Sequence, residues 1–236
     1  MDLIELVNIA DANVNAAHFA KQELDNSTLP VSIDSFISLS NVSVESLQSI
    51  LAIVHDNVFI SSSLAQIYID MGDVYLERQE FENSTPYFSI ALETLQGVGE
   101  VTAERLTKEF SNGAFNKYPH FNNIDIAKGI LLLAEAKASK GMSRSLSKQG
   151  NSAESSEYWR RAKAAYETLL SGKADHHTGG VAMINYGNML LEEGNIGGAK
   201  EIHLRTVAMY SQLEPFYAKE ALRELGYISN MERGRN

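Results

Sequence analysis

The sequence lacks cysteine altogether and contains few prolines. Among its 236 residues there is no Cys and there are four Pro. Without cysteine the chain can form no disulfide framework, no thiolate zinc site and no cysteine nucleophile, and this composition suits a reducing compartment. Because proline interrupts helices, so few prolines favour long helices. We therefore expect a cytoplasmic protein that consists mainly of helices.

Clusters of basic residues and long apolar runs are also missing. The formal net charge is -10, and 20 Lys and Arg residues are scattered among 30 Asp and Glu residues. Nucleic-acid binding needs grouped basic side chains, and negative charge opposes binding to anionic lipid. The first residues, MDLIELVNIADANVN, have no basic residue before their apolar stretch, and no later window approaches eighteen apolar residues. We expect neither nucleic-acid binding nor membrane insertion.

The sequence does contain two adjacent amphipathic helical patterns between Leu64 and Leu95. Apolar and small residues recur at intervals of three and four on both sides of the polar break ERQEFENS. This spacing places them on one face of each helix, and so short a break joins antiparallel neighbours. Gly72 lies inside the first helix, where glycine costs about 1 kcal/mol relative to alanine. We interpret Gly72 as a point of close approach by a second helix.

The pattern resembles the tetratricopeptide repeat, a degenerate helix-pair motif of about 34 residues. With Gly72 at the eighth position, the first copy has the signature residues Tyr68, Met71, Gly72, Tyr75, Ser84, Phe88, Ala91 and Gln96. A second copy has Met183, Tyr186, Gly187, Leu190, Ala199, His203 and Val207. A third copy, between them, has Ile130, Leu133, Ala134 and Lys137 in its first helix and Trp159, Ala162, Tyr166 and Leu169 in its second.

The resemblance implies an all-α fold, a right-handed superhelix of stacked antiparallel helix pairs that inserted helices make irregular. Residues 61–236 would form this domain, with repeats near 64–97, 125–171 and 178–213 and a terminal helix at 216–231. The spacing within the middle repeat predicts an exposed hairpin insertion at 139–156. In the terminal helix, Gly226 would take the eighth position.

Residues 1–60 lack the repeat signature and are expected to be a helical cap or, alternatively, a dimerisation segment. The pattern predicts one helix over residues 2–24 and another from Ser43 onward, with Ser43 as its cap. The least helical segment is SNGAFNKYPHFNN at 111–123. Its aromatic side chains either form an exposed contact patch or pack back onto the helices.

Enzyme motifs are not found. His176 and His177 follow Asp175, but adjacent histidines on a helix cannot both face one metal ion. We interpret them as part of the turn and cap before the next helix. The sequence offers neither a phosphate-binding glycine loop nor a serine elbow. It therefore predicts a protein that is not an enzyme and that needs no metal or other cofactor.

Proteins that resemble this family hold a peptide or a partner helix along their first helices, which line the concave side. Carried onto this chain, the family's contact positions give the candidate partner-binding residues Gln66, Ile69, Asp73, Glu77, Lys128, Glu135, Ile184, Asn188, Glu192, Arg223 and Tyr227. Such a groove would be apolar along one line and acidic along another. We expect it to hold a protein or peptide segment that is apolar and carries Lys or Arg, unless inserted helices fill it.

Two functions stay open at this point. The first is a non-catalytic protein–protein interaction module, such as an adaptor, scaffold or chaperone, with a homodimer as a further possibility. The alternative is a helical-repeat regulatory sensor whose curvature responds to a short peptide or a small ligand. The family's clamp for a terminal carboxylate needs lysine at the fifth position, where this chain has Ile69 and Ile184, so a chaperone-tail adaptor is disfavoured.

Overall fold

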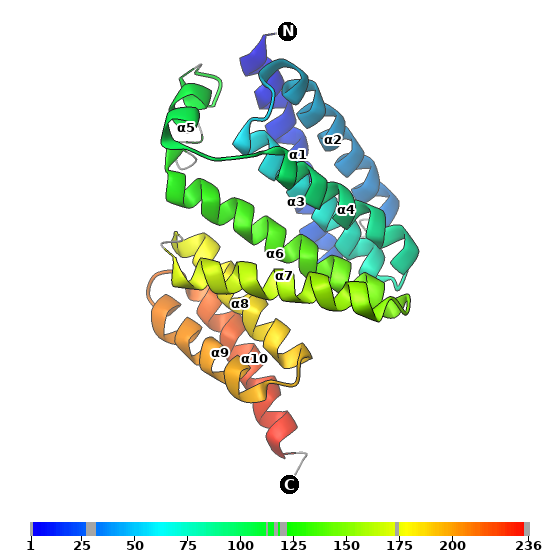
Figure 1. Ribbon diagram of the computed structural model, residues 1–236, viewed down its shortest axis with the longest axis vertical. Helices are drawn as coiled ribbons and strands as arrows, with labels where there is room; N and C mark the ends of the chain where they lie inside the picture. The colour runs from blue at the N-terminus through cyan, green and yellow to red at the C-terminus, as the bar shows by residue number, and fades with distance from the viewer. Residues whose placement is uncertain are drawn as a thin grey trace. The chain divides into compact units, whose positions relative to one another are not determined.

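The computed structural model describes residues 2–26, 32–111, 113–115, 118, 122–172 and 175–233. Within these ranges there are ten α-helices and no strand (Figure 1), which confirms the all-α prediction. Contacts divide the chain into two compact units, residues 1–162 (unit 1) and 163–236 (unit 2). Each unit has apolar core residues of its own.

Unit 1 consists of six helices and the first part of a seventh. They are α1 (Leu3–Asn26), α2 (Ile33–Val54), α3 (Val58–Glu77), α4 (Phe81–Gly97), α5 (Ala103–Phe110), α6 (Ile124–Lys148) and α7 (Ser152–Ser171), which continues into unit 2. Helix α3 contacts both α1 and α6, so these three helices form one layer. Helix α2 packs on α1 and α3, and α4 packs on α3 and α6.

Helices α3 and α4 form the antiparallel pair that the sequence predicts, and Phe88 lies at its centre. The Phe88 side chain is fully buried. A Cβ atom added at Gly72 of α3 would lie 2.8 Å from the Cε1 and Cζ atoms of this ring. One added at Gly141 of α6 would lie 2.3 Å from the same atoms. The ring thus fills the space that two missing side chains leave, and the close approach predicted at Gly72 is confirmed.

Three helix pairs share one type of turn. After α3, the N–H of Glu80 donates to the carbonyl of Tyr75 (2.9 Å) and the N–H of Gln79 to that of Leu76 (3.0 Å). This is the Schellman pattern, which satisfies the last carbonyls of a helix through a residue in the left-handed region. The same two bonds follow α6, through Gly150 and Asn151, and α8, through Gly194 and Asn195. The left-handed residues have φ values of 63°, 85° and 78° at Gln79, Gly150 and Gly194.

These turns correct the expected middle repeat. Helix α6 runs unbroken from Ile124 to Lys148, and Met142, Ser143 and Leu146 are buried, so the exposed hairpin insertion at 139–156 is wrong. Counted back from its turn, Ser143 rather than Ala134 stands where Gly72 stands in the first pair. The Ser143 hydroxyl donates to the carbonyl of Ser155 (2.7 Å), and the Ser155 hydroxyl donates to the carbonyl of Ser143 (2.9 Å). These bonds hold α6 against α7.

The N-terminal helices agree only in part with the prediction. Helix α1 is confirmed, but α2 begins at Ile33, ten residues before Ser43. Its cap is Ser32, whose hydroxyl accepts the N–H of Ser35 (3.1 Å), whereas Ser43 is buried in mid-helix and donates to the carbonyl of Leu39 (2.8 Å). By length and composition α2 meets the criteria for a membrane-spanning helix, which buried core helices of soluble proteins and signal sequences also meet; 22% of its apolar window is buried.

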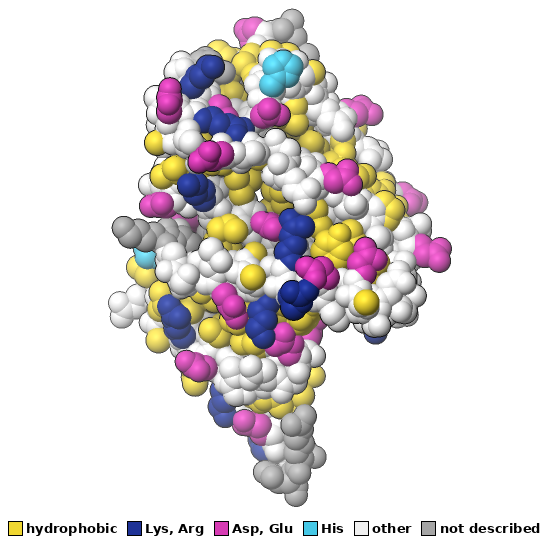
Figure 2. Space-filling model, in the orientation of Figure 1, with side chains coloured by type: hydrophobic (Ala, Val, Ile, Leu, Met, Phe, Trp, Pro, Cys, Tyr) yellow, Lys and Arg dark blue, Asp and Glu magenta, His cyan; other side chains and the backbone are white. Residues whose placement is uncertain are grey.

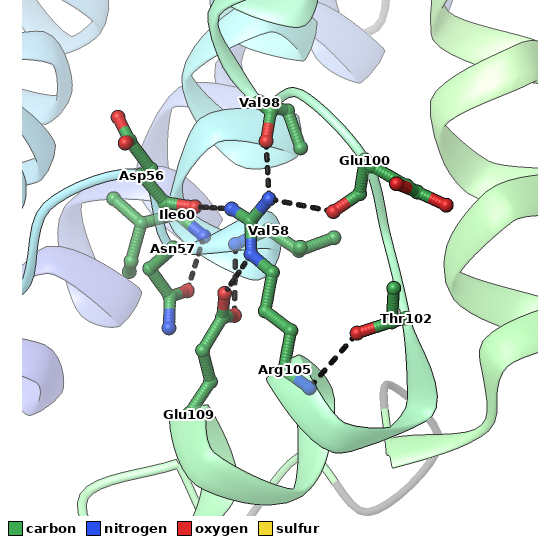
Figure 3. A network of polar contacts seen from close by, with 9 residues as sticks. All are labelled: Asp56, Asn57, Val58, Ile60, Val98, Glu100, Thr102, Arg105 and Glu109. Carbon is green, nitrogen blue, oxygen red and sulfur yellow. Dashed lines mark hydrogen bonds and ion pairs between the residues drawn. The ribbon is translucent and has the colours of Figure 1, made fainter.

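Helix α5 is fixed by the side chain of Arg105 (Figure 3). Its guanidinium donates to the carbonyl oxygens of Val98, Glu100 and Asp56, and its Nε donates to Glu109 (2.7 Å). The second oxygen of Glu109 accepts the N–H of Val58 (3.0 Å), at the first residue of α3. One arginine therefore ties α5 to the turn between α2 and α3.

The aromatic side chains of 111–123 pack inward where the structure describes them. Phe115 is fully buried, and the ring of Tyr118 stacks on that of Phe59 with 4.0 Å between centroids. Tyr118 also donates to Asp11 of α1 (2.5 Å). His120 and Phe121 lie outside the described residues. The described part of this segment is core, not a contact patch.

Unit 2 contains the rest of α7, α8 (His176–Glu192), α9 (Ile196–Tyr210) and α10 (Pro215–Arg233). Helix α9 packs on both α8 and α10. A Cβ atom at Gly187 would lie 2.5 Å from the buried ring of His203, so this glycine also marks a close approach. Gly226 does not, because no atom lies within 4 Å of its Cβ position. The terminal helix is present as α10, but its glycine makes no packing contact.

Candidate functional site

Three carboxylates lie along one face of α3 in unit 1. Asp70, Asp73 and Glu77 follow one another at intervals of three and four, which places them on one side of the helix. We call them the acidic stripe. Asp70 is buried, Asp73 is half-buried and Glu77 is exposed. Gln66, one turn earlier, donates to Asp70 (2.6 Å) and continues the polar face.

The helices on either side of α3 supply basic groups to the stripe. From α1, His18 Nδ1 lies 3.2 Å from an oxygen of Asp70, and Lys21 Nζ lies 3.7 Å from an oxygen of Glu77. From α6, Lys137 donates to the side-chain oxygen of Gln66 (2.9 Å). Two lysines and one histidine thus face three carboxylates, and Lys21 also pairs with a fourth, Asp25 of α1, so the carboxylates outnumber the basic groups.

Asp73 is the carboxylate that is least well compensated. Its burial, with the like charges of Asp70 and Glu77, raises its pKa from 3.8 to about 6, although Lys137 and Lys21 act in the opposite direction. An acid that keeps a raised pKa beside two cations occupies a site where one more positive group would be favourable. Perturbed groups of this kind gather at functional sites.

Burial opposes the charge of Lys21, but this effect is outweighed. Its hydrogen bond to Asp25 and the charges of Glu77, Asp25 and Asp73 leave the pKa of Lys21 raised. Lys21 is therefore charged at neutral pH, where it faces the acidic stripe. The unmet charge in this cluster is negative.

Sequence reasoning identified this face only in part. The structure brings the predicted Gln66, Asp73 and Glu77 together, but Ile69 is fully buried and belongs to the core. The residues that it missed are His18, Lys21, Asp70 and Lys137. Asp70 had a signal in its spacing of four from Gln66. The basic groups had none, because they reach α3 only through the packing of α1 and α6.

Two further predicted residues, Lys128 and Glu135, line a cavity on α6. The cavity has a volume of about 480 Å³ and lies among α6, the connection after α4 and the part of α7 in unit 1. Its apolar lining includes the side chains of Leu95, Val101, Leu131 and Leu132. Glu135 accepts a hydrogen bond from Nε of Arg161 on α7 (2.7 Å). We call this space the α6 cavity.

The remaining predicted residues belong to unit 2 and differ in exposure. Ile184 is half-buried against the core, and the buried side-chain oxygen of Asn188 has no hydrogen-bond partner among the described residues. Glu192 is exposed at the end of α8. On α10, Arg223 pairs with Glu220 (2.7 Å) and Glu224 (3.1 Å), and Tyr227 is 57% exposed.

Charges of both signs are mixed over the face that Figure 2 shows, without a field of basic side chains. Among the described residues, no three His, Asp or Glu side chains gather as they would around a metal ion. Asp175 caps α8 by accepting the N–H of Thr178 (2.9 Å), and His177 Nδ1 lies 2.5 Å from the hydroxyl of Tyr217.

Unit 1 therefore carries two features that can hold a ligand by charge and shape, the acidic stripe and the α6 cavity. Both lie on first helices of the pairs described above, α3 and α6. Comparison with known proteins adds no relative to this description, since no protein-family model matches the chain and no curated protein matches it.

Proposed function

We propose that this chain is a non-catalytic protein-interaction module of the tetratricopeptide-like class, and that unit 1 holds a basic segment of a partner protein along the acidic stripe. One observation carries the proposal. Asp70, Asp73 and Glu77 lie in line between two helices that supply too little positive charge to balance them. A partner's lysine or arginine near Asp73 would complete the cluster.

Two regularities support the repeat class. The glycine and the ring that it faces are sixteen residues apart in both pairs, from 72 to 88 and from 187 to 203. The turns of three pairs make the same two hydrogen bonds. Units that pack in one repeated way expose their first helices as a continuous binding layer. In unit 1 that layer is formed by α1, α3 and α6.

The length of the stripe sets the size of the partner segment. From Asp70 to Glu77 the helix rises about 10 Å, because each of the seven steps adds about 1.5 Å. An extended chain covers this distance with about three residues. Since Ile69 is buried, the stripe itself offers charge rather than an apolar line. The partner therefore needs one or two Lys or Arg residues within three consecutive positions.

The test is a titration of fluorescent peptides measured by anisotropy. A twelve-residue apolar peptide with two central lysines is compared with the same peptide carrying glutamines or glutamates there. We expect only the lysine peptide to bind, and we expect its affinity to fall with added salt, because exposed ion pairs are screened.

Protein variants locate the site. The double variant Asp73→Asn and Glu77→Gln should lose most of the binding, because it removes the carboxylates that a ligand can reach. Glu45→Gln, which removes an exposed carboxylate from α2, is the matched control and should bind as the wild type does. Equal affinity of all three proteins for the lysine peptide, or a preference for the glutamate peptide, would refute the proposal.

A further inference from the structure

The α6 cavity lies on a different face of α6 from the one that meets the acidic stripe. Glu135 and Lys137 are two residues apart, so their side chains leave the helix in nearly opposite directions. Lys137 reaches Gln66 on α3, whereas Glu135 reaches Arg161 on α7. A ligand in the cavity would therefore not compete with a segment on the stripe, and the two sites can be tested separately.

The cavity combines an apolar wall with separate charges. Leu131 and Leu132 lie between Lys128 and Glu135 along α6, and Leu95 and Val101 face them from the α4 side. Lys128 and Glu135 are seven residues apart, which puts them on one face of the helix at a distance of about 10 Å along its axis. A volume of about 480 Å³ is within the range of small-ligand sites.

Two basic and two acidic side chains line the cavity, but only one basic and one acidic side chain form an ion pair. Glu135 and Arg161 form an ion pair with 2.7 Å between Oε1 and Nε. Lys128 and Glu100 also line the cavity, and neither side chain has an ion-pair or hydrogen-bond partner within the described ranges. Figure 3 shows the Glu100 side chain directed away from Arg105, which binds only its backbone oxygen. One unpaired cation and one unpaired anion thus remain.

We infer that the α6 cavity binds an apolar zwitterion, namely a short apolar peptide with free termini or a single apolar amino acid. The ligand's carboxylate meets Lys128, its ammonium meets Glu100, and its apolar side chains cover the leucines. A ligand with a single charge leaves Lys128 or Glu100 unpaired beside it. An extended tripeptide is about 10 Å long, which matches the length of the apolar wall that runs along α6 from Lys128 to Glu135.

The first experiment compares ligands by isothermal titration calorimetry with the full chain. The probes are the tripeptide Leu-Ala-Leu, free leucine, N-acetylated Leu-Ala-Leu and Leu-Ala-Leu amide. We expect the free tripeptide to bind about fivefold more tightly than either modified form, because each exposed ion pair contributes up to about that factor. Tighter binding of leucine than of the tripeptide would support the site with the amino acid as its ligand. Binding of neither would overturn the inference.

The second experiment assigns each end of the ligand to a residue. Lys128→Gln should weaken binding of the free tripeptide about fivefold but leave binding of the amide unchanged. Glu100→Gln should likewise weaken binding of the free tripeptide about fivefold but leave binding of the acetylated form unchanged. Lys148→Gln, at the far end of the same helix, is the control and should change nothing. The stripe variant Asp73→Asn should also bind the tripeptide normally, so failure of one site is distinguishable from failure of the other. An unchanged affinity for the tripeptide in both Lys128→Gln and Glu100→Gln would overturn the assignment.

Discussion

Replacing Gly141 by alanine sets helix propensity against packing. Alanine is favoured over glycine inside a helix by about 1 kcal/mol. The new Cβ atom would, however, lie 2.3 Å from the Cε1 and Cζ carbons of the Phe88 ring, and the Cβ position of Gly72 lies 2.8 Å from the same two carbons. Overpacking of a buried site costs about 1–3 kcal/mol. Because the fully buried ring has no free direction, we expect a net loss of about 2 kcal/mol in the free energy of unfolding.

The measurement is urea denaturation followed by circular dichroism, with Gly97→Ala as the control. Gly97 ends α4, in the same unit, and no atom lies within 4 Å of its Cβ position, so its substitution should be neutral or stabilising. Adding Phe88→Leu to Gly141→Ala should relieve part of the overpacking. The double variant should therefore lose less free energy of unfolding than the two single variants lose together. A Gly141→Ala protein as stable as Gly97→Ala would refute the packing described for Phe88.

Three further changes probe charge and burial. Asp73→Asn should stabilise the protein by about 1–2 kcal/mol at pH 7.5, after allowance for partial exposure. Because the native pKa of about 6 exceeds the ordinary 3.8, ionisation of Asp73 opposes folding increasingly as the pH rises from about 4 to 6. The gain from Asp73→Asn should therefore appear in denaturation at pH 7.5 and vanish below pH 4. An equal gain at both pH values would contradict this prediction. Burial lowers the pKa of His203, whose ring nitrogens have no partner among the described residues. Protonation of His203 therefore opposes folding below about pH 6.5, and wild type should lose stability relative to His203→Leu in thermal unfolding at pH 5 compared with pH 7.5. Arg105→Ala should cost about 2 kcal/mol and speed hydrogen exchange in α5, whereas Arg78→Ala, which breaks one exposed ion pair, should cost under about 0.5 kcal/mol; similar losses would show that Arg105 does not fix α5.

The helix pair α3 and α4 could be predicted because its signals are local. Apolar residues recur with the helical period, the break between the helices is short, and a glycine inside a helix indicates a close neighbour. The same reasoning gave Gly187 the eighth position of the second copy, and its Cβ position does lie 2.5 Å from the ring of His203. It failed at Gly226, where the glycine meets no neighbour at all.

Buried serines explain the main errors. The segment 139–156 resembles a loop in composition, yet the hydroxyl of Ser145 lies within hydrogen-bond distance of Ser84 and Thr85 (both 2.7 Å) and donates to the carbonyl of Phe81 (2.8 Å). Small hydroxyl groups that pack between helices have no hydrophobic period to detect. The same cause moved the start of α2, where Ser43 is a core residue rather than a cap.

The acidic stripe could be predicted on one helix only. Asp73 and Glu77 follow from the contact positions that the resemblance implies, because those positions all lie on one helix and are counted from Gly72. Lys21 and Lys137 reach the stripe from helices that lie far away in the sequence, and no local pattern encodes that meeting. Ile69 was misplaced because its side chain turns into the core, which a position rule cannot foresee.

The turns also determine where a chain of this kind can grow during evolution. Residues 78–80, 149–151 and 193–195 each join two helices with three residues. An extra residue there would misplace both hydrogen bonds and every contact beyond them. Residues 98–123, which join two pairs instead, already accommodate a whole extra helix. Lineages that differ in length should therefore differ between the pairs and keep the three-residue joints intact.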